Sequence, residues 1–105
     1  KLKIRNVKTN ELRELNASGL FVFVGFTPNT DLIKEPVEKD EFGFIITNQN
    51  METNIPGFFV AGDCRSQLIR QITNASGDAT TASVAAEKYL EAQVENRKQE
   101  SIPSS

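Results

Sequence analysis

The sequence contains no histidine and only one cysteine, Cys64, and these absences exclude several kinds of chemistry. A Cys/His zinc site, a Ser-His or Cys-His catalytic pair and an intramolecular disulfide all need side chains that this chain lacks. Disulfide exchange also needs a second thiol. We therefore expect no metal site and no catalytic residue within the chain, and a lone thiol is compatible with a reducing cytoplasm.

Basic clusters and long apolar runs are also missing. The 12 Lys and Arg residues are outnumbered by 14 Asp and Glu residues, which gives a net charge of -2. Because phosphate binding requires clustered Lys and Arg, we expect no nucleic-acid partner. No apolar run approaches the roughly 18–20 residues of a membrane span, and no signal-peptide pattern is present, so we expect no membrane segment.

The length of 105 residues, of which 38% are hydrophobic, suits one small domain or a piece of a larger one. A domain of this size leaves much of its surface in water and is only marginally stable by itself. The sequence starts at Lys1 and not at a methionine. That start fits a trimmed or processed chain, and it also fits the last part of a longer protein.

The first part of the chain has the pattern of short strands. Apolar residues alternate with charged ones over residues 1–9, which predicts a half-buried strand, and residues 12–15 return as a second strand after a turn. Residues 20–24 are apolar on both faces and predict a buried strand that Gly25 ends. After a connection, a series of short elements follows: a brief strand near Val37, a turn at 40–43, a strand at 44–47, a loop at 48–57 and a buried strand at 58–61.

The last third of the chain has the period of a helix. Over residues 71–95, small apolar residues recur three or four positions apart on one face: Ala75, Ala79, Ala82, Ala86 and Leu90. Such a face lets a helix approach a sheet or a flat ligand closely, although alanine is also simply the best helix former. Residues 96–105 are polar and predict a disordered tail.

The Gly62-Asp63 pair lies between the last predicted strand and the helix expected to start near Gln71. The glycines form neither a G-x-G-x-x-G motif nor a P-loop. However, glycine lets a backbone approach a ligand, an ionised aspartate accepts hydrogen bonds from hydroxyls, and a helix N-terminus attracts an electron-rich group. The same residues also suit an ordinary turn in which Asp63 caps a backbone N–H, and spacing alone favours this simpler interpretation.

Three stretches of the sequence stand out as motifs: GLFVFVGFTPNT at 19–30, GFIITNQNMETNIPGFFVAGDCRSQLIRQI at 43–72 and AAEKYLE at 85–91. Together they resemble the C-terminal segment of low-molecular-weight, bacterial-type thioredoxin reductases. The pattern T-x-x-P-G-x-F-x-A-G-D at 53–63 is typical of the wider pyridine nucleotide-disulfide oxidoreductase superfamily. The pair Arg70-Gln71 is typical of the thioredoxin reductase group.

This resemblance implies an α/β fold class, namely part of an FAD/NAD(P)-binding Rossmann-like domain with three ββα layers, in which strands are followed by one long C-terminal helix. It also implies a division of the chain. Residues 1–24 correspond to the last strands of an NADPH-binding domain, 25–29 to the interdomain connector and 30–95 to the C-terminal part of the FAD-binding domain. The change from strand to helix patterns independently favours a boundary near 25–28.

The resemblance also implies roles for individual residues. The Asp63 carboxylate would accept a hydrogen bond from a ribityl hydroxyl of FAD, and Gly62 would allow that close approach. Arg70, Gln71 and Ile72 match the segment beside the isoalloxazine ring, where backbone N–H groups at the helix start face the pyrimidine carbonyl. For Arg70 a solvated surface arginine is the alternative, and Cys64 is expected to be a packing residue.

The activity implied for the longer parent enzyme is transfer of electrons from NADPH through FAD to a C-x-x-C disulfide and on to thioredoxin. The parent would be a cytoplasmic homodimer. The chain itself lacks the C-x-x-C and both dinucleotide glycine motifs, so we expect it to be inactive alone. Two alternatives stay open: a piece of a related flavoprotein, such as the alkyl hydroperoxide reductase flavoprotein subunit or a ferredoxin-NADP reductase, and an inactive truncation product that associates with itself.

Overall fold

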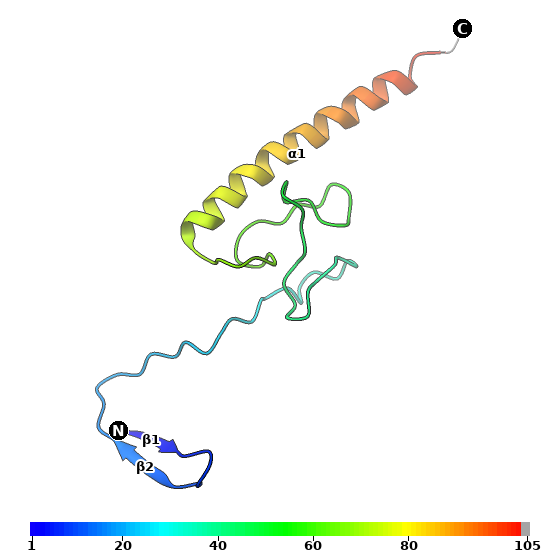
Figure 1. The fold of residues 1–105 in the computed structure, drawn as a ribbon. Helices are drawn as coiled ribbons and strands as arrows, with labels where there is room; N and C mark the ends of the chain where they lie inside the picture. The colour runs from blue at the N-terminus through cyan, green and yellow to red at the C-terminus, as the bar shows by residue number, and fades with distance from the viewer. Residues whose placement is uncertain (104–105) are drawn as a thin grey trace.

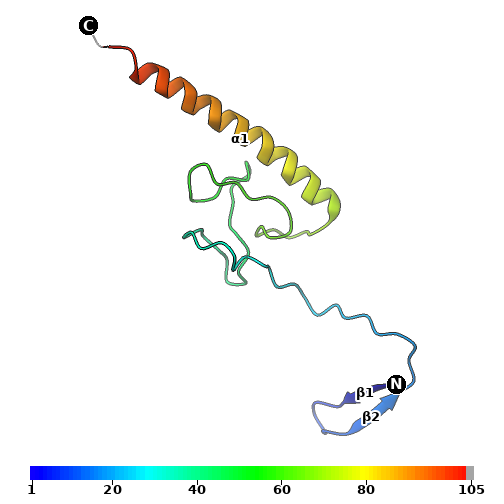
Figure 2. The ribbon, with the colours of Figure 1, turned by 180° about the vertical axis from the view of Figure 1, so that it is seen from behind.

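The computed structural model describes residues 1–103, and it has an elongated shape. A two-stranded hairpin lies at one end, and an extended segment leads from it to an irregular central region. One long helix runs past that region and ends at Glu100 (Figures 1 and 2). The radius of gyration is 22.7 Å. A compact domain of about 100 residues would have roughly 13 Å. The hairpin and the central region are therefore separate structural parts.

The hairpin pairs β1 (Leu2–Arg5) with β2 (Leu12–Leu15) in antiparallel register, with Leu2 opposite Leu15. The two predicted strands are thus confirmed, but the first is shorter than the predicted 1–9, and it is not half-buried, because Leu2 is its only partly buried residue. The strand ends because the Asn6 side-chain oxygen accepts the N–H groups of Lys8 and Thr9, which folds the chain into a turn.

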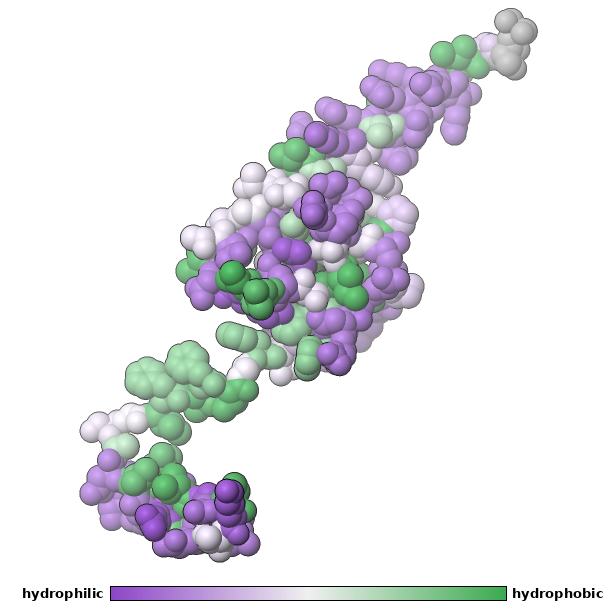
Figure 3. Space-filling model, in the orientation of Figure 1, coloured by the Kyte–Doolittle hydropathy of each residue, from purple (hydrophilic) through white to green (hydrophobic). Residues whose placement is uncertain are grey.

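The buried strand predicted at residues 20–24 is wrong for this chain. The segment is extended but unpaired, and its side chains lie in solvent, with Phe21 and Phe23 85% and 88% exposed. In Figure 3 it forms a green apolar stretch between the hairpin and the central region. A strand needs a neighbour to take its N–H and C=O groups, and none of the described residues pairs with this segment.

The central region is held by a small apolar core. Val37, Ile45 and Val60 form the buried cluster, and Ile45 is completely buried. Isolated β-bridges surround this core, joining Ile45 to Lys39 and to Arg65, and Glu52 to Phe59. The strands predicted near Val37, at 44–47 and at 58–61 are therefore single bridges in the structure, because no neighbouring strand extends them among the described residues.

The turn predicted at 40–43 is confirmed. The Asp40 carboxylate accepts the N–H groups of Phe42 and Phe44 at 3.0 and 2.9 Å. Gly43 adopts a φ of 91°, a left-handed value that glycine tolerates without strain. The turn brings Phe44 and the fully buried Ile45 back into the central region.

Helix α1 (Ile72–Glu100) begins where the sequence predicted, with Gln71 as its N-cap. It ends later than the predicted residue 95, so the disordered tail is wrong for residues 96–100, and residues 104–105 lie outside the described part of the chain. Arg97 and Lys98 in the last turn favour helix here, because cations interact well with the C-terminal end of the helix dipole.

The face of α1 that packs differs partly from the predicted alanine stripe. Ala75, Ala82 and Ala86 are half-buried as expected, whereas Ala79 and Leu90 are exposed. The residues that contact the central region include Asp78, the buried residue of the helix, and Tyr89. Tyr89 meets Phe59 edge to face, with ring centroids 6.1 Å apart. Among the described residues, no helix is both long enough and apolar enough to cross a membrane.

Replacement of the central core residue should unfold the central region. We expect Ile45→Ala to lower the free energy of unfolding by about 2–5 kcal/mol, because it leaves a cavity in a core that has few members. The matched control is Ile46→Ala. Because Ile46 is 42% exposed, its replacement should lower the free energy of unfolding much less. Urea denaturation followed by circular dichroism measures both, and equal losses would contradict this assignment of the core.

The exposed run 20–24 should make the chain associate. We expect Phe23→Asp to lower the average mass measured by light scattering at high protein concentration, because a charge interrupts an apolar segment of high β-propensity. Phe42→Asp serves as the control, since Phe42 is also exposed but lies outside the run. An equal effect of both variants would show that the run 20–24 does not determine the association of the chain.

Candidate functional site

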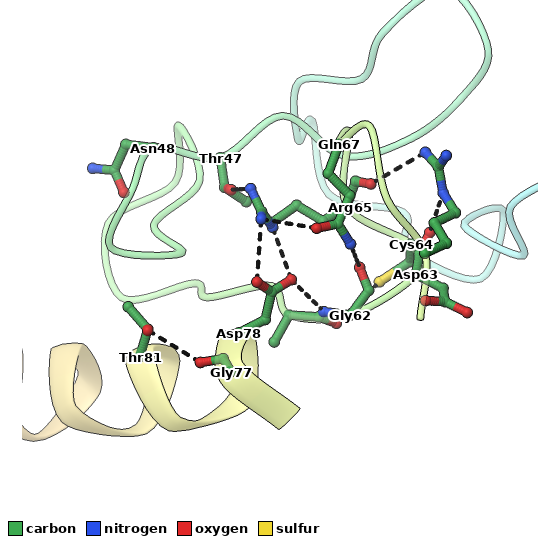
Figure 4. A network of polar contacts seen from close by, with 12 residues as sticks. Thr47, Asn48, Gly62, Asp63, Cys64, Arg65, Gln67, Gly77, Asp78 and Thr81 are labelled. Carbon is green, nitrogen blue, oxygen red and sulfur yellow. Dashed lines mark hydrogen bonds and ion pairs between the residues drawn. The ribbon is translucent and has the colours of Figure 1, made fainter. Parts of the chain in front are cut away.

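The Gly62 turn, defined here as residues 61–65, follows the bridge at Phe59. Gly62 has a φ of 88°, in the left-handed region that disfavours residues with a Cβ. Its N–H donates to Asp78 Oδ2 at 3.1 Å. Its carbonyl accepts the Gln67 side-chain amide at 2.8 Å and the Arg65 N–H at 3.1 Å. Both polar groups of this residue are therefore fixed from within the chain (Figure 4).

A buried ion pair lies directly behind the turn. The Arg65 guanidinium contacts Asp78 through two nitrogens, Nε to Oδ2 at 3.0 Å and Nη2 to Oδ1 at 3.2 Å. Thr47 Oγ1 and Gln67 Oε1 accept the remaining guanidinium hydrogen bonds at 3.3 and 3.0 Å. Figure 4 shows Arg65 between the turn, α1 and the segment that carries Thr47. The guanidinium thus joins three parts of the chain.

The environment of Asp78 favours its ionised form. The hydrogen bond from Arg65 lowers the pKa of this carboxyl below its ordinary value, and the Gly62 N–H adds to the effect. Desolvation by burial opposes them, since a buried carboxylate loses its hydration. The hydrogen bonds outweigh the effect of burial, so the pKa of Asp78 is lowered overall.

Asp63 itself points away from this network. The residue is exposed, and among residues 1–103 its carboxylate takes part in no hydrogen bond or ion pair. The simple turn in which Asp63 caps a backbone N–H is thus not the arrangement found. Its carbonyl accepts Arg70 Nε at 3.1 Å, which fixes the backbone while the carboxylate faces solvent.

Arg70 is held in place and is not a freely solvated surface arginine. Its guanidinium lies 3.6 Å from the centroid of the Phe44 ring, a cation–π arrangement. It also donates to the carbonyls of Asp63 and Arg65. Nearby, the pKa of Asp40 is lowered, chiefly by the Ser66 hydroxyl that donates to it at 2.6 Å. An open hollow of about 530 Å³ lies on this side, lined by residues that include Phe44, Ser66 and Arg70.

The start of α1 leaves backbone donors available. Gln71 is the N-cap but makes no side-chain capping hydrogen bond, and the first turn contains no acidic residue. Ile72, the first helical residue, is exposed. The first N–H groups of a helix have no partner within it, so this end can receive an electron-rich group.

The structure brings Gly62, Asp63 and Arg70 into one connected group, and Gln71 and Ile72 follow Arg70 directly. Sequence reasoning missed three residues that support this group: Arg65, Gln67 and Asp78. One signal could have found Asp78, a carboxylate that lies between Ala75 and Ala82 on the packed helix face.

Cys64 packs against the apolar core cluster, as predicted, and its Sγ lies 3.6 Å from the Ala61 carbonyl. Within the described residues, no group of three or more His, Cys, Asp or Glu side chains is placed to hold a metal ion.

The chain matches the model of a known protein family. Residues 1–79 match the model of the pyridine nucleotide-disulphide oxidoreductase family. The chain belongs to this family. It is 50% identical over 90 residues to the "34.2 kDa protein in rubredoxin operon" of Clostridium pasteurianum, covering 86% of this chain and 29% of that protein. It is 41% identical over 97 residues to a thioredoxin reductase of Peptoclostridium acidaminophilum, covering 87% of this chain and 31% of that one.

Solved structures agree with this membership. The crystal structure of thioredoxin reductase from Streptococcus pyogenes superposes with a TM-score of 0.71 at 41% identity, covering 86% of this chain and 29% of that chain. The predicted resemblance to thioredoxin reductases and the predicted partial α/β, Rossmann-like fold class are confirmed. The chain spans less than a third of the length of these relatives.

The ion pair at Asp78 should make the stability of the chain depend on acid pH. In the unfolded chain an aspartate titrates near pH 3.9. Because folding lowers the pKa of Asp78, its contribution is fully present above about pH 4 and is lost as the pH falls through the lower folded pKa. We expect the free-energy difference between wild type and Asp78→Asn to be largest above pH 4 and to shrink below it.

Urea denaturation from pH 7 down to pH 2.5 measures this difference. Asp31→Asn is the control, since Asp31 is exposed. A constant difference between wild type and Asp78→Asn across this range would contradict the role assigned to the Asp78 carboxylate.

Proposed function

We propose that this chain forms one wall of an FAD site in an NADPH-dependent disulfide oxidoreductase of the thioredoxin reductase type. Family membership supports the reaction class. The observation that carries the assignment of the site is the Gly62 turn, whose backbone is fixed from within while the Asp63 carboxylate faces solvent. Such a carboxylate accepts hydrogen bonds from ligand hydroxyls.

The residues present fit a ribityl chain at this turn. A ligand would approach from the side of the exposed Asp63, because Gly62 itself is buried and the position of its missing Cβ faces Ala75. The positive φ of Gly62 turns the chain so that Asp63 faces outward. The carbonyl of Asp63 is already occupied by Arg70, which leaves the carboxylate as the acceptor for a hydroxyl group.

The start of α1 suits the other end of the cofactor. The N–H groups at Gln71 and Ile72 lack side-chain caps, and they would donate to the pyrimidine carbonyl of a flavin. Negative charge on that carbonyl would be stabilised by the positive end of the helix dipole. Arg70, which stacks on the Phe44 ring, would hold the segment that leads into the helix.

For the whole enzyme we propose transfer of electrons from NADPH through FAD to a C-x-x-C disulfide and on to thioredoxin. Residues 1–24, 25–29 and 30–95 would belong to the NADPH-binding domain, the connector and the FAD-binding domain. The whole protein would act as a homodimer in the cytoplasm. The chain contributes FAD contacts and no redox-active cysteine pair, since it holds one cysteine, so we expect it to be inactive alone.

Self-association is a second candidate behaviour of the isolated chain, and the exposed apolar run 20–24 favours it. A related flavoprotein is the alternative within the same enzyme class. The complete reading frame that contains this chain distinguishes the possibilities: a ferredoxin-type reductase would lack the C-x-x-C, and a fused thioredoxin-like region would indicate a hydroperoxide reductase system. A frame without a Rossmann glycine motif would contradict the proposed function.

Removal of the Asp63 carboxylate should weaken FAD binding. In the protein made from the complete reading frame, we expect Asp63→Ala to raise the dissociation constant of FAD about tenfold or more, as expected for one charge-assisted hydrogen bond. Titration of FAD fluorescence with the apoprotein measures it. Asp31→Ala, at another exposed aspartate, is the control. Unchanged affinity in Asp63→Ala would remove this residue from the FAD site.

A further inference from the structure

The one buried carboxylate among the described residues, Asp78, is absent from the contacts proposed for FAD. It pairs with Arg65 behind the Gly62 turn, on the side away from the exposed Asp63. The pair is well shielded, with side-chain exposures of 16% for Arg65 and 10% for Asp78. The guanidinium donates four hydrogen bonds, two of them to Asp78, so the pair is held firmly in one geometry.

We propose that Arg65 and Asp78 are positioning residues, and that their ion pair fixes the Gly62 turn and the start of α1 in the relative arrangement that FAD requires. The inference rests on the proposed function of this turn. Neither side chain would touch the cofactor; both would act through Gly62 and through the helix.

The ion pair fixes the Gly62 backbone. A glycine has the widest range of backbone conformations, so a turn built on it is not fixed by its own sterics. Here Asp78 accepts the Gly62 N–H, and Gln67, itself bonded to Arg65, donates to the Gly62 carbonyl. The network thus selects one conformation of a residue that could adopt many, and this conformation turns the Asp63 side chain outward.

The ion pair also sets the distance between the two proposed cofactor contacts. Asp78 belongs to α1 and lies about 9 Å along the helix axis from Ile72, at roughly 1.5 Å per residue. Because the helix is rigid over that length, a contact from Asp78 to the turn also sets where Ile72 lies relative to Asp63. The Asp78 carboxylate therefore fixes the position of the proposed ribityl contact relative to the proposed flavin-ring contact.

The energy of a buried ion pair also favours a positioning role. Moving two charges out of water costs so much that a buried ion pair often adds little net stability compared with apolar side chains of similar size. A guanidinium that contacts a carboxylate through two nitrogens does, however, fix direction as well as distance. Geometry is therefore what this pair contributes beyond an apolar contact, and a cofactor site needs its contacts held closely in place.

The test uses the protein from the complete reading frame and compares Asp78→Asn with Tyr89→Leu. Tyr89 lies on the same helix and packs on Phe59, away from the Gly62 turn, so its replacement destabilises α1 without touching the network. Two quantities are measured: hydrogen exchange of the peptide 60–66 in the apoprotein, by mass spectrometry, and the FAD dissociation constant. Urea denaturation gives the stability loss against which both are compared.

We expect Asp78→Asn to speed exchange in 60–66 and to weaken FAD binding about tenfold, while Tyr89→Leu at a similar loss of stability changes neither by more than about twofold. Arg65→Lys, which keeps the charge but loses the two-pronged contact, should show a smaller loss of FAD affinity than Asp78→Asn. Equal effects of Asp78→Asn and Tyr89→Leu would overturn the inference, because the pair would then be only structural.

The outcomes separate this inference from the proposed function. A wild-type protein that binds no FAD would refute the proposed function, while the exchange measurement would still decide whether the pair fixes the turn. If FAD binds and Asp63→Ala weakens it, but Asp78→Asn leaves both the exchange and the affinity unchanged, the proposed function stands and the positioning role is wrong.

Discussion

The ion pair between Arg65 and Asp78 is the contact on which the central part of this chain depends. The apolar core there has few members, grouped around Ile45, and it lies largely among irregular segments. The guanidinium and the carboxylate join the Gly62 turn, helix α1 and the segment that carries Thr47. In a region with little regular sheet, such charge-assisted contacts determine how the segments are placed relative to one another.

The proposed cofactor contacts come from the turn and from the helix start. An exposed carboxylate at Asp63 and uncapped N–H groups near Ile72 offer an acceptor and donors that no side chain among residues 1–103 occupies. Their supporting contacts lie behind them, in Asp78 and in Arg70 stacked on Phe44. In the proposed site, the buried Asp78 would therefore matter as much as the residues that face the ligand.

The N-terminal end of the chain behaves differently from the middle. The hairpin and the apolar run 20–24 make no core of their own, and the run lies in solvent. The family relatives are about three times as long as the matched region. Apolar composition predicts strands at 20–24, 44–47 and 58–61, but a strand forms only where another strand supplies hydrogen-bond partners. These segments remain extended or joined by single bridges for that reason.

The sequence by itself determined the features that depend on neighbouring residues: the hairpin strands, the turn at Asp40, the start of α1 at Ile72, and the family through the motif at 53–63. Only the tertiary structure decided the pairing of Arg65 with Asp78 and the outward orientation of Asp63. Periodicity and turn preferences act within a few residues, so they can be read along the chain. A contact between side chains thirteen positions apart exists only after the turn and the helix have packed together.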